Sequence, residues 1–141
     1  MTGSRAARLK YFRRIVFVSK TASTNSCISE NPAGPDVVRA GIQTSGRGRY
    51  GAQWSSPEGG LWFSFLIRKK IINPYIYIVI TSLAVKKALA KTGIKTRIKW
   101  PNDILACGKK ICGILVENDY YNSRVVIGIG INTNNKPPEL G

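Results

Sequence analysis

The sequence predicts a single α+β domain in which strands outnumber helices. The chain has 141 residues, a length typical of one domain, and 43% of them are hydrophobic, which is enough to build one core. Strand-like segments occur six times along the chain, whereas helix-bounding residues bracket two segments. The sequence contains no run of about 18 uncharged apolar residues, so we expect no membrane span. We therefore predict one domain over residues 1–141.

The first third of the chain predicts two strands around a short helix. An apolar segment at 15–18 is typical of a strand, and Ser23, Thr24 and Asn25 behind it are residue types that cap helices. We expect a short helix from there to about residue 30. The sequence Asn-Pro-Ala-Gly-Pro then indicates a turn, and residues 37–43 are expected to form the second strand.

The middle third predicts a long loop, a strand and the longer helix. Residues 44–53 are rich in Gly and Arg and indicate a long flexible loop. Residues 61–67 carry large apolar side chains at every second position, as a strand does. A helix of about 17 residues is bracketed by Asn73 as a cap, Pro74 at the first helical position and Gly93 beyond its end.

The last third predicts three strands, at 94–99, 110–117 and 125–131. The first of them has Lys or Arg at every second position and therefore one basic face. In the last strand, Gly128 and Gly130 fall on one face, where they leave room for a group to lie flat against the sheet. A β-bulge or close packing of a helix is the alternative interpretation of these glycines.

The charge and composition of the chain favour an anionic partner and exclude several kinds of catalytic and metal site. Lys and Arg total 22 against 7 acidic residues, and the resulting net charge of +15 favours an anionic partner. The chain has no histidine, which excludes Ser-His and Cys-His nucleophile pairs and histidine-based zinc sites. Cys27, Cys107 and Cys112 are odd in number and widely spaced, so we expect free thiols and a cytoplasmic location.

Three segments carry groups suited to binding anions, and each has an ordinary structural explanation when taken alone. Residues 46–51 (GRGRYG) place two guanidinium groups on a glycine-rich loop, which suits phosphate or carboxylate oxygens but also describes a solvated basic loop. Residues 99–103 (KWPND) combine a cation, an amide and a carboxylate in what is also common turn chemistry. Lys110 begins a predicted strand, where it can reach an anion over the sheet or extend into solvent.

Taken together and in this order, these segments resemble the catalytic domain of the biotin protein ligases. The resemblance covers residues of about 14–138 and rests on Ser23-Thr24-Asn25, on Gln43 with GRGRYG and Trp54, and on SPEGGLWFS, KWPND, KKICGILVE and GIGIN. It implies a mixed, mainly antiparallel β-sheet with helices packed on one face. It also implies that the chain lacks the N-terminal DNA-binding domain of the repressor-type ligases and ends before their small C-terminal domain.

The resemblance implies a two-step ligase reaction with ATP and Mg²⁺. Biotin and ATP give biotinyl-5′-AMP and pyrophosphate, and the biotinyl group then passes to a lysine of a biotin carboxyl carrier protein. Such a reaction suits a chain without histidine, because the biotin carboxylate is already ionised near pH 7. The site has chiefly to align two anions and neutralise their charge.

The resemblance also assigns the site residues. The catalytic residues are Lys110, Arg49 and Asp103; Lys110 would bridge the biotin carboxyl and the α-phosphate, and Asp103 is the candidate magnesium ligand. The biotin-binding residues are Ser23, Thr24, Asn25, Gln43, Arg47, Gly48, Arg49, Lys110 and Gly113. The nucleotide-binding residues are Arg47, Arg49, Trp54, Lys99, Asn102, Lys110 and Asn132. Trp54 would stack on adenine, and the Gly- and Arg-rich loop at 44–53 (the arginine loop) would close over the adenylate.

Two other functions stay open at this point. One is a truncated, catalytically impaired biotin-binding protein. The other is a basic nucleic-acid-binding module, for which the charge of +15 and the interleaved aromatic residues are the support. We expect no specific DNA binding, and a homodimer joined through an exposed sheet edge is compatible with the resemblance.

Overall fold

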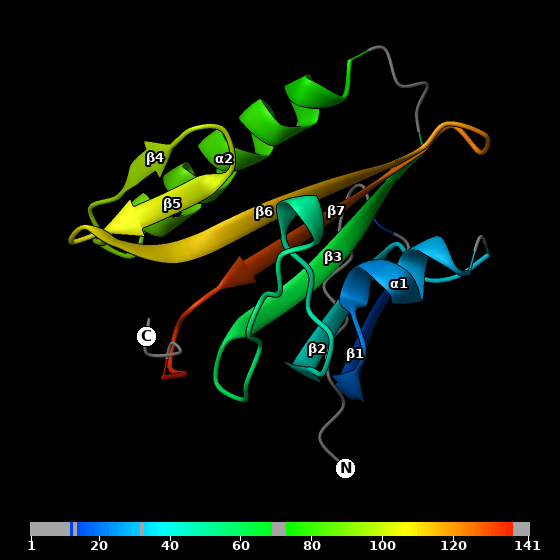
Figure 1. The fold of residues 1–141 in the computed structure, drawn as a ribbon, viewed down its shortest axis with the longest axis horizontal. Helices are drawn as coiled ribbons and strands as arrows, with labels where there is room; N and C mark the ends of the chain where they lie inside the picture. The colour runs from blue at the N-terminus through cyan, green and yellow to red at the C-terminus, as the bar shows by residue number, and fades with distance from the viewer. Residues whose placement is uncertain (1–11, 13, 32, 69–72, 137–141) are drawn as a thin grey trace.

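A seven-stranded mixed sheet forms the body of the molecule in the computed structural model, which describes residues 12, 14–31, 33–68 and 73–136 (Figure 1). The elements are β1 (Ile15–Thr21), α1 (Thr24–Ser29), β2 (Val37–Gln43), the 3₁₀ turn η1 (Arg49–Gly51), β3 (Leu61–Arg68), α2 (Pro74–Ala90), β4 (Arg97–Lys99), β5 (Asp103–Ala106), β6 (Lys109–Asp119) and β7 (Arg124–Ile131). The strand order is β1-β2-β3-β7-β6-β5-β4, in which β1 and β2 are parallel and the other neighbours are antiparallel. The predicted α+β class with a mixed, mainly antiparallel sheet is confirmed.

Most of the predicted elements are present at the expected places. The Asn73 side chain accepts a hydrogen bond from the Tyr75 amide at 2.9 Å, so α2 begins with the predicted cap and with Pro74 in its first turn. Two predictions were wrong in detail. The strand expected at 94–99 begins only at Arg97, and the sequence analysis missed β5, whose four residues follow a Pro-Asn turn directly and pair with strands on both sides.

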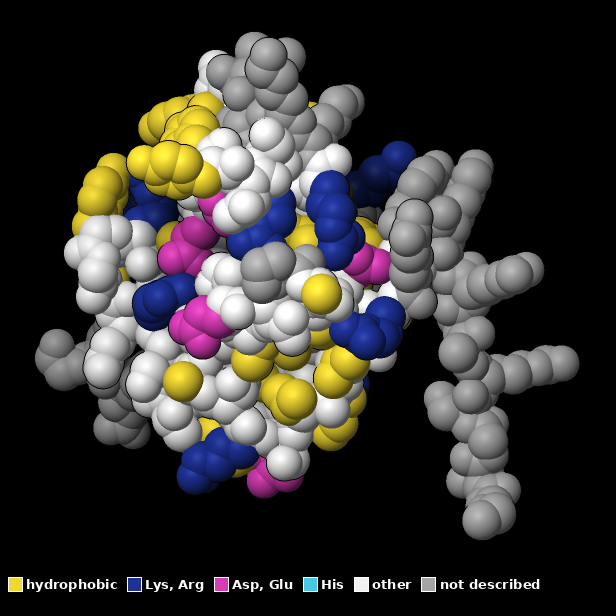
Figure 2. Space-filling view, turned by 90° about the vertical axis from the view of Figure 1, so that its right-hand side faces the viewer, with side chains coloured by type: hydrophobic (Ala, Val, Ile, Leu, Met, Phe, Trp, Pro, Cys, Tyr) yellow, Lys and Arg dark blue, Asp and Glu magenta, His cyan; other side chains and the backbone are white. Residues whose placement is uncertain are grey.

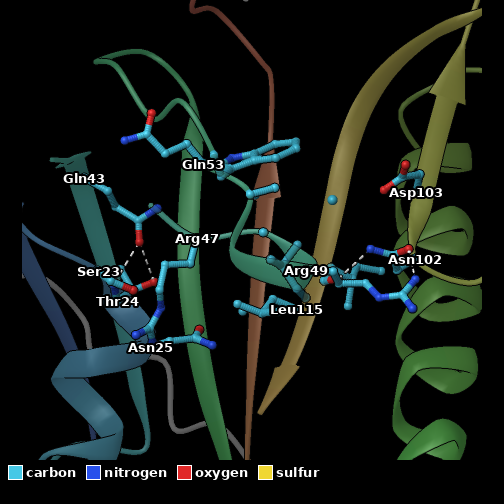
Figure 3. Close-up of a pocket in the computed structure, with 18 of the residues that line it drawn as sticks. Ser23, Thr24, Asn25, Gln43, Arg47, Arg49, Gln53, Asn102, Asp103 and Leu115 are labelled. Atoms are coloured by element: carbon cyan, nitrogen blue, oxygen red, sulfur yellow. Dashed lines mark hydrogen bonds between the residues drawn. The ribbon is translucent and has the colours of Figure 1, made fainter. Parts of the chain in front are cut away.

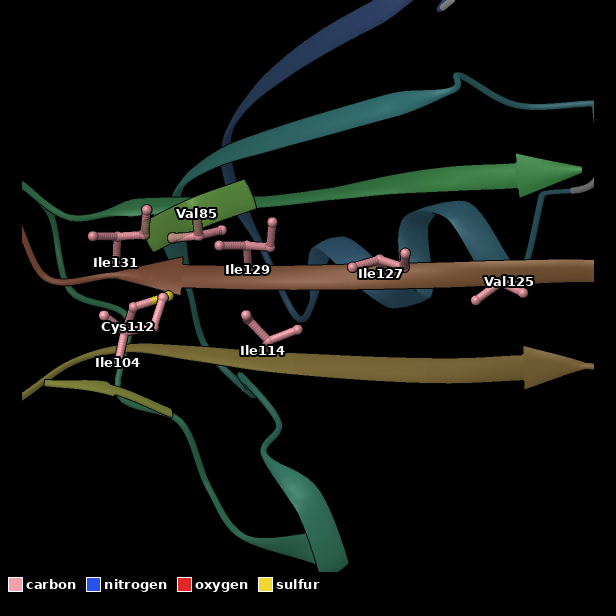
Figure 4. Close-up of a cluster of buried hydrophobic side chains, with 8 residues drawn as sticks. All are labelled: Val85, Ile104, Cys112, Ile114, Val125, Ile127, Ile129 and Ile131. Carbon is pink, nitrogen blue, oxygen red and sulfur yellow. The ribbon is translucent and has the colours of Figure 1, made fainter. Parts of the chain in front are cut away.

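The two helices lie on opposite faces of the sheet, so the prediction that they pack on one face was wrong. Val85 of α2 packs with Ile127 and the other odd-numbered apolar residues of β7, whereas Ile28 of α1 packs with Val126. Neighbouring residues of a strand point to opposite faces. Figure 4 shows Val85 on one side of β7 and α1 on the other. The physical reason is that β7 is central and has no polar face, so both of its sides need cover.

The glycines of β7 allow two close approaches on the α1 face. A Cβ atom at Gly128 would lie 2.3 Å from Asn25 Oδ1, and one at Gly130 would lie 2.3 Å from Trp54 Nε1. Both interpretations of the sequence therefore apply: the N-terminal end of α1 packs closely at Gly128, and an indole ring lies against the sheet at Gly130.

The three cysteines are free, as predicted. Burial raises the pKa of the Cys112 thiol to about 12, and the charge of the Asp103 carboxylate adds to that shift. Among the described residues, none of the helices is both long and apolar enough to cross a membrane.

Candidate active site

A cavity of about 240 Å³ lies on the α1 face of the sheet, between the start of α1, the arginine loop and strands β5 and β6 (Figure 3). It brings together nearly all of the residues predicted for the site. The predicted residues that line it are Ser23, Thr24, Asn25, Gln43, Arg47, Gly48, Arg49, Trp54, Asn102, Asp103, Lys110 and Gly113.

The first wall of the cavity consists of the N-terminal end of α1 and the end of β2. Ser23 occupies the N-cap position of α1, but its side chain makes no capping hydrogen bond, contrary to what its residue type predicts. The Thr24 amide donates to Gln43 Oε1 at 2.8 Å, and the Thr24 hydroxyl oxygen lies 3.0 Å from the same atom. Gln43 Nε2 in turn donates to Ser56 Oγ at 2.8 Å. These bonds hold the Gln43 amide in one orientation beside the cavity.

The floor of the cavity is an indole ring lying on glycines. Trp54 covers Gly130 and also Gly113, where a Cβ atom would lie 2.8 Å from the ring. The edge of the ring meets Trp62 at a centroid distance of 6.4 Å, and its N–H has no hydrogen-bond acceptor among the described residues. Lys110 Nζ lies 5.1 Å from the centre of the Trp54 ring. Trp54 therefore stacks on the sheet here and shares a cation–π contact with the predicted catalytic lysine.

The second wall carries the polar groups of β5 and β6. Lys110 Nζ lies 2.8 Å from Asp103 Oδ1, an ion pair without the geometry of a hydrogen bond, in which the lysine side chain is 43% exposed. Asn102 is fixed against β6 because its Nδ2 donates to the Ile114 carbonyl at 3.1 Å and its own carbonyl accepts from the Ile114 amide at 3.0 Å. The Asn102 Oδ1 atom remains directed to the arginine loop, where Arg49 Nη1 donates to it at 3.0 Å.

The arginine loop spans the two walls and is folded on itself. The Gly48 amide donates to the Ala52 carbonyl at 2.7 Å, and the Trp54 amide donates to the Gly46 carbonyl at 2.8 Å. At its tip, Tyr50 has a φ of 56°, in the left-handed region. The loop predicted at 44–53 thus contains a short hydrogen-bonded hairpin around η1, which sets the two arginines on either side of the cavity.

Each arginine has a hydrogen-bond partner within the protein. Arg47 Nη2 donates to Glu117 Oε2 at 3.0 Å, whereas Arg49 Nη2 donates to the Tyr50 hydroxyl at 2.7 Å besides its bond to Asn102. The two guanidinium groups of this site are therefore held in place by hydrogen bonds within the protein.

Two predicted nucleotide contacts, Lys99 and Asn132, do not line the cavity. Lys99 ends β4 and is exposed. Asn132 follows β7, where its amide donates to the Ile111 carbonyl at 2.8 Å and its Oδ1 accepts from Asn135 at 2.8 Å. Lys99 pairs with the cavity residue Asp103 but lies beyond the lining on the short strand β4, so its role and that of Asn132 as nucleotide contacts stay predictions.

Sequence reasoning missed Ser64 and Glu117, which bond to the residues of the first wall. Ser64 is a fully buried polar residue in the apolar run of β3, and this exception to the pattern is the signal that could have found it. Glu117 ends the motif KKICGILVE, where a terminal carboxylate resembles an ordinary surface residue.

Comparison with known proteins identifies the group to which this arrangement belongs. The model of the biotin/lipoate A/B protein ligase family matches residues 14–134. The chain belongs to this family. Among its curated relatives, the bifunctional ligase/repressor BirA of Bacillus subtilis is 42% identical over 132 residues, which cover 87% of this chain and 40% of the relative. The biotin–[acetyl-CoA-carboxylase] ligase of Mycobacterium tuberculosis is 31% identical over 142 residues, 92% of this chain and 53% of the relative.

Solved structures of the family have the same fold. The biotin protein ligase of Aquifex aeolicus in complex with biotin and ATP has a TM-score of 0.78 and 35% identity, covering 91% of this chain and 56% of its own. The Leishmania major ligase in complex with biotinyl-5-AMP has a TM-score of 0.69 and 28% identity, covering 88% and 59%. The chain thus spans roughly 40 to 60% of the length of these members of the family.

Proposed function

We propose that the chain is a biotin protein ligase: it activates biotin with ATP to biotinyl-5′-AMP and transfers the biotinyl group to a lysine of a biotin carboxyl carrier protein. The observation that carries this proposal is the convergence of Lys110, Arg47, Arg49 and the Thr24–Gln43 wall on one cavity, in a member of the biotin/lipoate ligase family.

In the first step, a biotin carboxylate oxygen bonds to the α-phosphorus of ATP while the bond to the β-phosphate oxygen breaks and pyrophosphate leaves. Two anions have to meet in this step, so the main contribution of the protein is positive charge in a site from which water is excluded. A cation–anion contact at 4 Å is worth about 1 kcal/mol in water but about 4 kcal/mol at an effective dielectric constant of 20. Lys110 bridges the two reacting groups, and the arginine loop supplies the cover.

The starting position of Lys110 suits this role. Its ammonium group lies between the Asp103 carboxylate and the face of Trp54, at the border of the two walls. An incoming carboxylate or phosphate replaces Asp103 as the partner of Lys110. In the second step the neutral amine of the carrier lysine attacks the acyl carbon, AMP leaves, and Asp103 is positioned to take up the proton that the new amide loses.

Magnesium is the one metal that the proposed reaction requires. Asp103 is the one carboxylate among the described residues that line the cavity, and no group of three or more acidic or cysteine residues suited to a metal occurs in the described part of the chain. Mg²⁺ in nucleotide sites is commonly held by one or two carboxylates together with substrate phosphates. The residues therefore fit an ion that arrives with ATP and is contacted by Asp103, where it would neutralise phosphate charge.

The two alternatives are distinguished by different observations. The family match supports the ligase interpretation and not a nucleic-acid-binding module. On the face seen in Figure 2, Lys and Arg side chains are interspersed with Asp and Glu side chains. A binding protein without turnover differs from the ligase only in activity. Cytoplasmic location and homodimerisation through a sheet edge stay predictions.

Mass spectrometry of a carrier domain incubated with the chain, biotin and MgATP tests the proposal. We expect the carrier mass to increase by one biotinyl group, and no increase when ATP is omitted. If biotin binds in a calorimetric titration but neither biotinyl-5′-AMP nor modified carrier forms, the chain is a binding protein and the ligase proposal is wrong.

A further inference from the structure

Glu117 does not line the cavity itself but holds two residues that do. Its Oε2 atom accepts a hydrogen bond from Asn25 Nδ2 at 2.6 Å and another from Arg47 Nη2 at 3.0 Å. Asn25 belongs to α1 and Arg47 to the loop, so one carboxylate on β6 connects both to the sheet.

A row of hydrogen-bonded polar side chains runs from Asn25 through Ser64 and Thr24 to Gln43 at the end of β2. The Asn25 Oδ1 atom accepts a hydrogen bond from Ser64 Oγ, and Ser64 Oγ lies 2.6 Å from Thr24 Oγ1. The Thr24 amide then donates to Gln43 Oε1. Asn25, Ser64 and Thr24 are each at most 3% exposed, so their polar atoms depend on one another for partners.

The Glu117 carboxylate fixes the direction of the bonds in this row. An ionised carboxylate only accepts, so Asn25 turns its NH₂ group to Glu117 and its Oδ1 to Ser64. The single hydroxyl hydrogen of Ser64 is then used by Asn25, and the Ser64–Thr24 contact requires Thr24 to donate. The Thr24 hydroxyl hydrogen is consequently used by Ser64, Gln43 Oε1 is held by the Thr24 amide, and the Thr24 oxygen offers only lone pairs to a ligand.

We propose that Glu117 is a positioning residue that makes this wall an acceptor of ring N–H groups and so selects a cyclic urea over rings without such donors. The inference rests on the proposed function, because the ureido ring of biotin carries N–H donors on both sides of its carbonyl. In Glu117→Gln, residue 117 no longer only accepts: its carbonyl oxygen can still accept, but its new NH₂ group can donate to Asn25 Oδ1, so the direction of the row is no longer fixed. In the reversed direction Asn25 turns its NH₂ group to Ser64, Ser64 donates to Thr24, and a lone pair of Thr24 is no longer free for the ligand.

The binding experiment compares biotin with its two lactam analogues, in which one or the other ureido N–H is replaced by CH₂. One neutral hydrogen bond corresponds to about a three- to tenfold change in Kd. We expect Glu117→Gln to weaken biotin binding by about that factor. The analogue that lacks the N–H facing Thr24 should bind the variant as it binds the wild type, so the variant no longer prefers biotin to this analogue. Glu58→Gln, which removes the same charge from an exposed turn, is the matched control and should bind both ligands like the wild type.

The double variant Asn25→Asp/Glu117→Gln separates direction from charge. Asn25→Asp alone places two carboxylates together and should weaken biotin binding at least tenfold. In the double variant the amide of residue 117 donates to Asp and Ser64 again donates to an acceptor, so biotin affinity and discrimination should return to within about threefold of the wild type. If the double variant binds no better than Glu117→Gln, Glu117 acts only through its pair with Arg47 and the proposal is overturned.

A ligand-free measurement keeps this inference separate from the proposed function. Urea unfolding is measured for the wild type, Asn25→Asp, Glu117→Gln and the double variant. Asn25→Asp should be destabilising when residue 117 is Glu but nearly neutral when it is Gln, because the Gln side-chain amide can donate to the new carboxylate. Equal costs in the two backgrounds overturn the inferred direction even if biotin binds. A wild-type chain that binds no biotin counts against the proposed function, while the unfolding comparison still decides the direction of the row.

Discussion

Replacing Gly130 by alanine tests whether the Trp54 indole lies flat on the sheet as the floor of the cavity. The added Cβ would lie 2.3 Å from Trp54 Nε1 and 2.7 Å from its Cε2, whereas carbon atoms in favourable contact are about 3.5 to 4.0 Å apart. β7 is hydrogen-bonded on both sides, to β3 and β6, so the backbone cannot retreat and the ring has to move by more than about 1 Å. That movement also breaks the edge contact with Trp62.

Two effects of opposite sign decide the magnitude. Overpacking of a well-filled site costs about 1–3 kcal/mol, whereas removing a glycine from a strand interior gains about 0.5–1 kcal/mol. We therefore expect Gly130→Ala to lower the free energy of unfolding by about 1–2 kcal/mol in the wild type. In a Trp54→Ala background the obstacle is gone, and the same substitution should be neutral or stabilising by up to about 1 kcal/mol.

Urea denaturation of the four proteins measures the coupling between the two positions. Because residues that touch are expected to couple, the cost of Gly130→Ala should differ between the two backgrounds by about 1–3 kcal/mol. An equal cost in both backgrounds would show that Trp54 does not rest on Gly130, and the description of the cavity floor would have to be abandoned.

Four further predictions concern the site and the thiols. Lys110→Ala should reduce pyrophosphate release at least a hundredfold with an unchanged circular dichroism spectrum, since the side chain is half exposed; near wild-type release would remove Lys110 from the mechanism. Arg49→Ala should loosen the loop over the adenylate and increase biotinylation of bystander lysines, and an unchanged leak rate would contradict a role of this arginine in the lid. Because the folded pKa of Cys112 is raised from 9.0 to about 12, its contribution to stability is complete below pH 9 and is lost between about pH 9 and 12, which pH-dependent unfolding of the wild type and Cys112→Ala checks. At pH 8 the exposed Cys107 should react with iodoacetamide while Cys112 does not, and mass spectrometry of the labelled peptides distinguishes the two thiols.

The sequence predicts the parts of the site that lie in short motifs. The arginine loop, the Asn102-Asp103 turn and Lys110 are each recognisable from a few neighbouring residues, and the cavity contains all of them. The alternation in β7 likewise predicts a cleared surface, because the period of a strand is a local property.

The sequence does not predict features that depend on distant contacts. Asn25 and Glu117 are 92 positions apart, and nothing near either residue indicates that they meet. The placement of α1 and α2 on opposite faces was missed for a similar reason: apolar residues on both sides of β7 show that both faces are covered, but not by which helix. Lys99 shows the same limit: it pairs with the cavity residue Asp103 across β4 and β5, yet it lies outside the cavity lining, and its role as a nucleotide contact stays a prediction.

The position of β7 in the chain and in the sheet has a consequence for folding during synthesis on the ribosome. It is the last of the seven described strands along the chain, yet it lies at the centre of the sheet and joins β1-β2-β3 to β6-β5-β4. Until it emerges, β3 and β6 both lack the partner strand that joins them, which leaves open edges that are prone to pair wrongly. The cavity, which Gly128 and Gly130 of β7 line together with residues of both halves of the sheet, is therefore complete only after synthesis has passed residue 131.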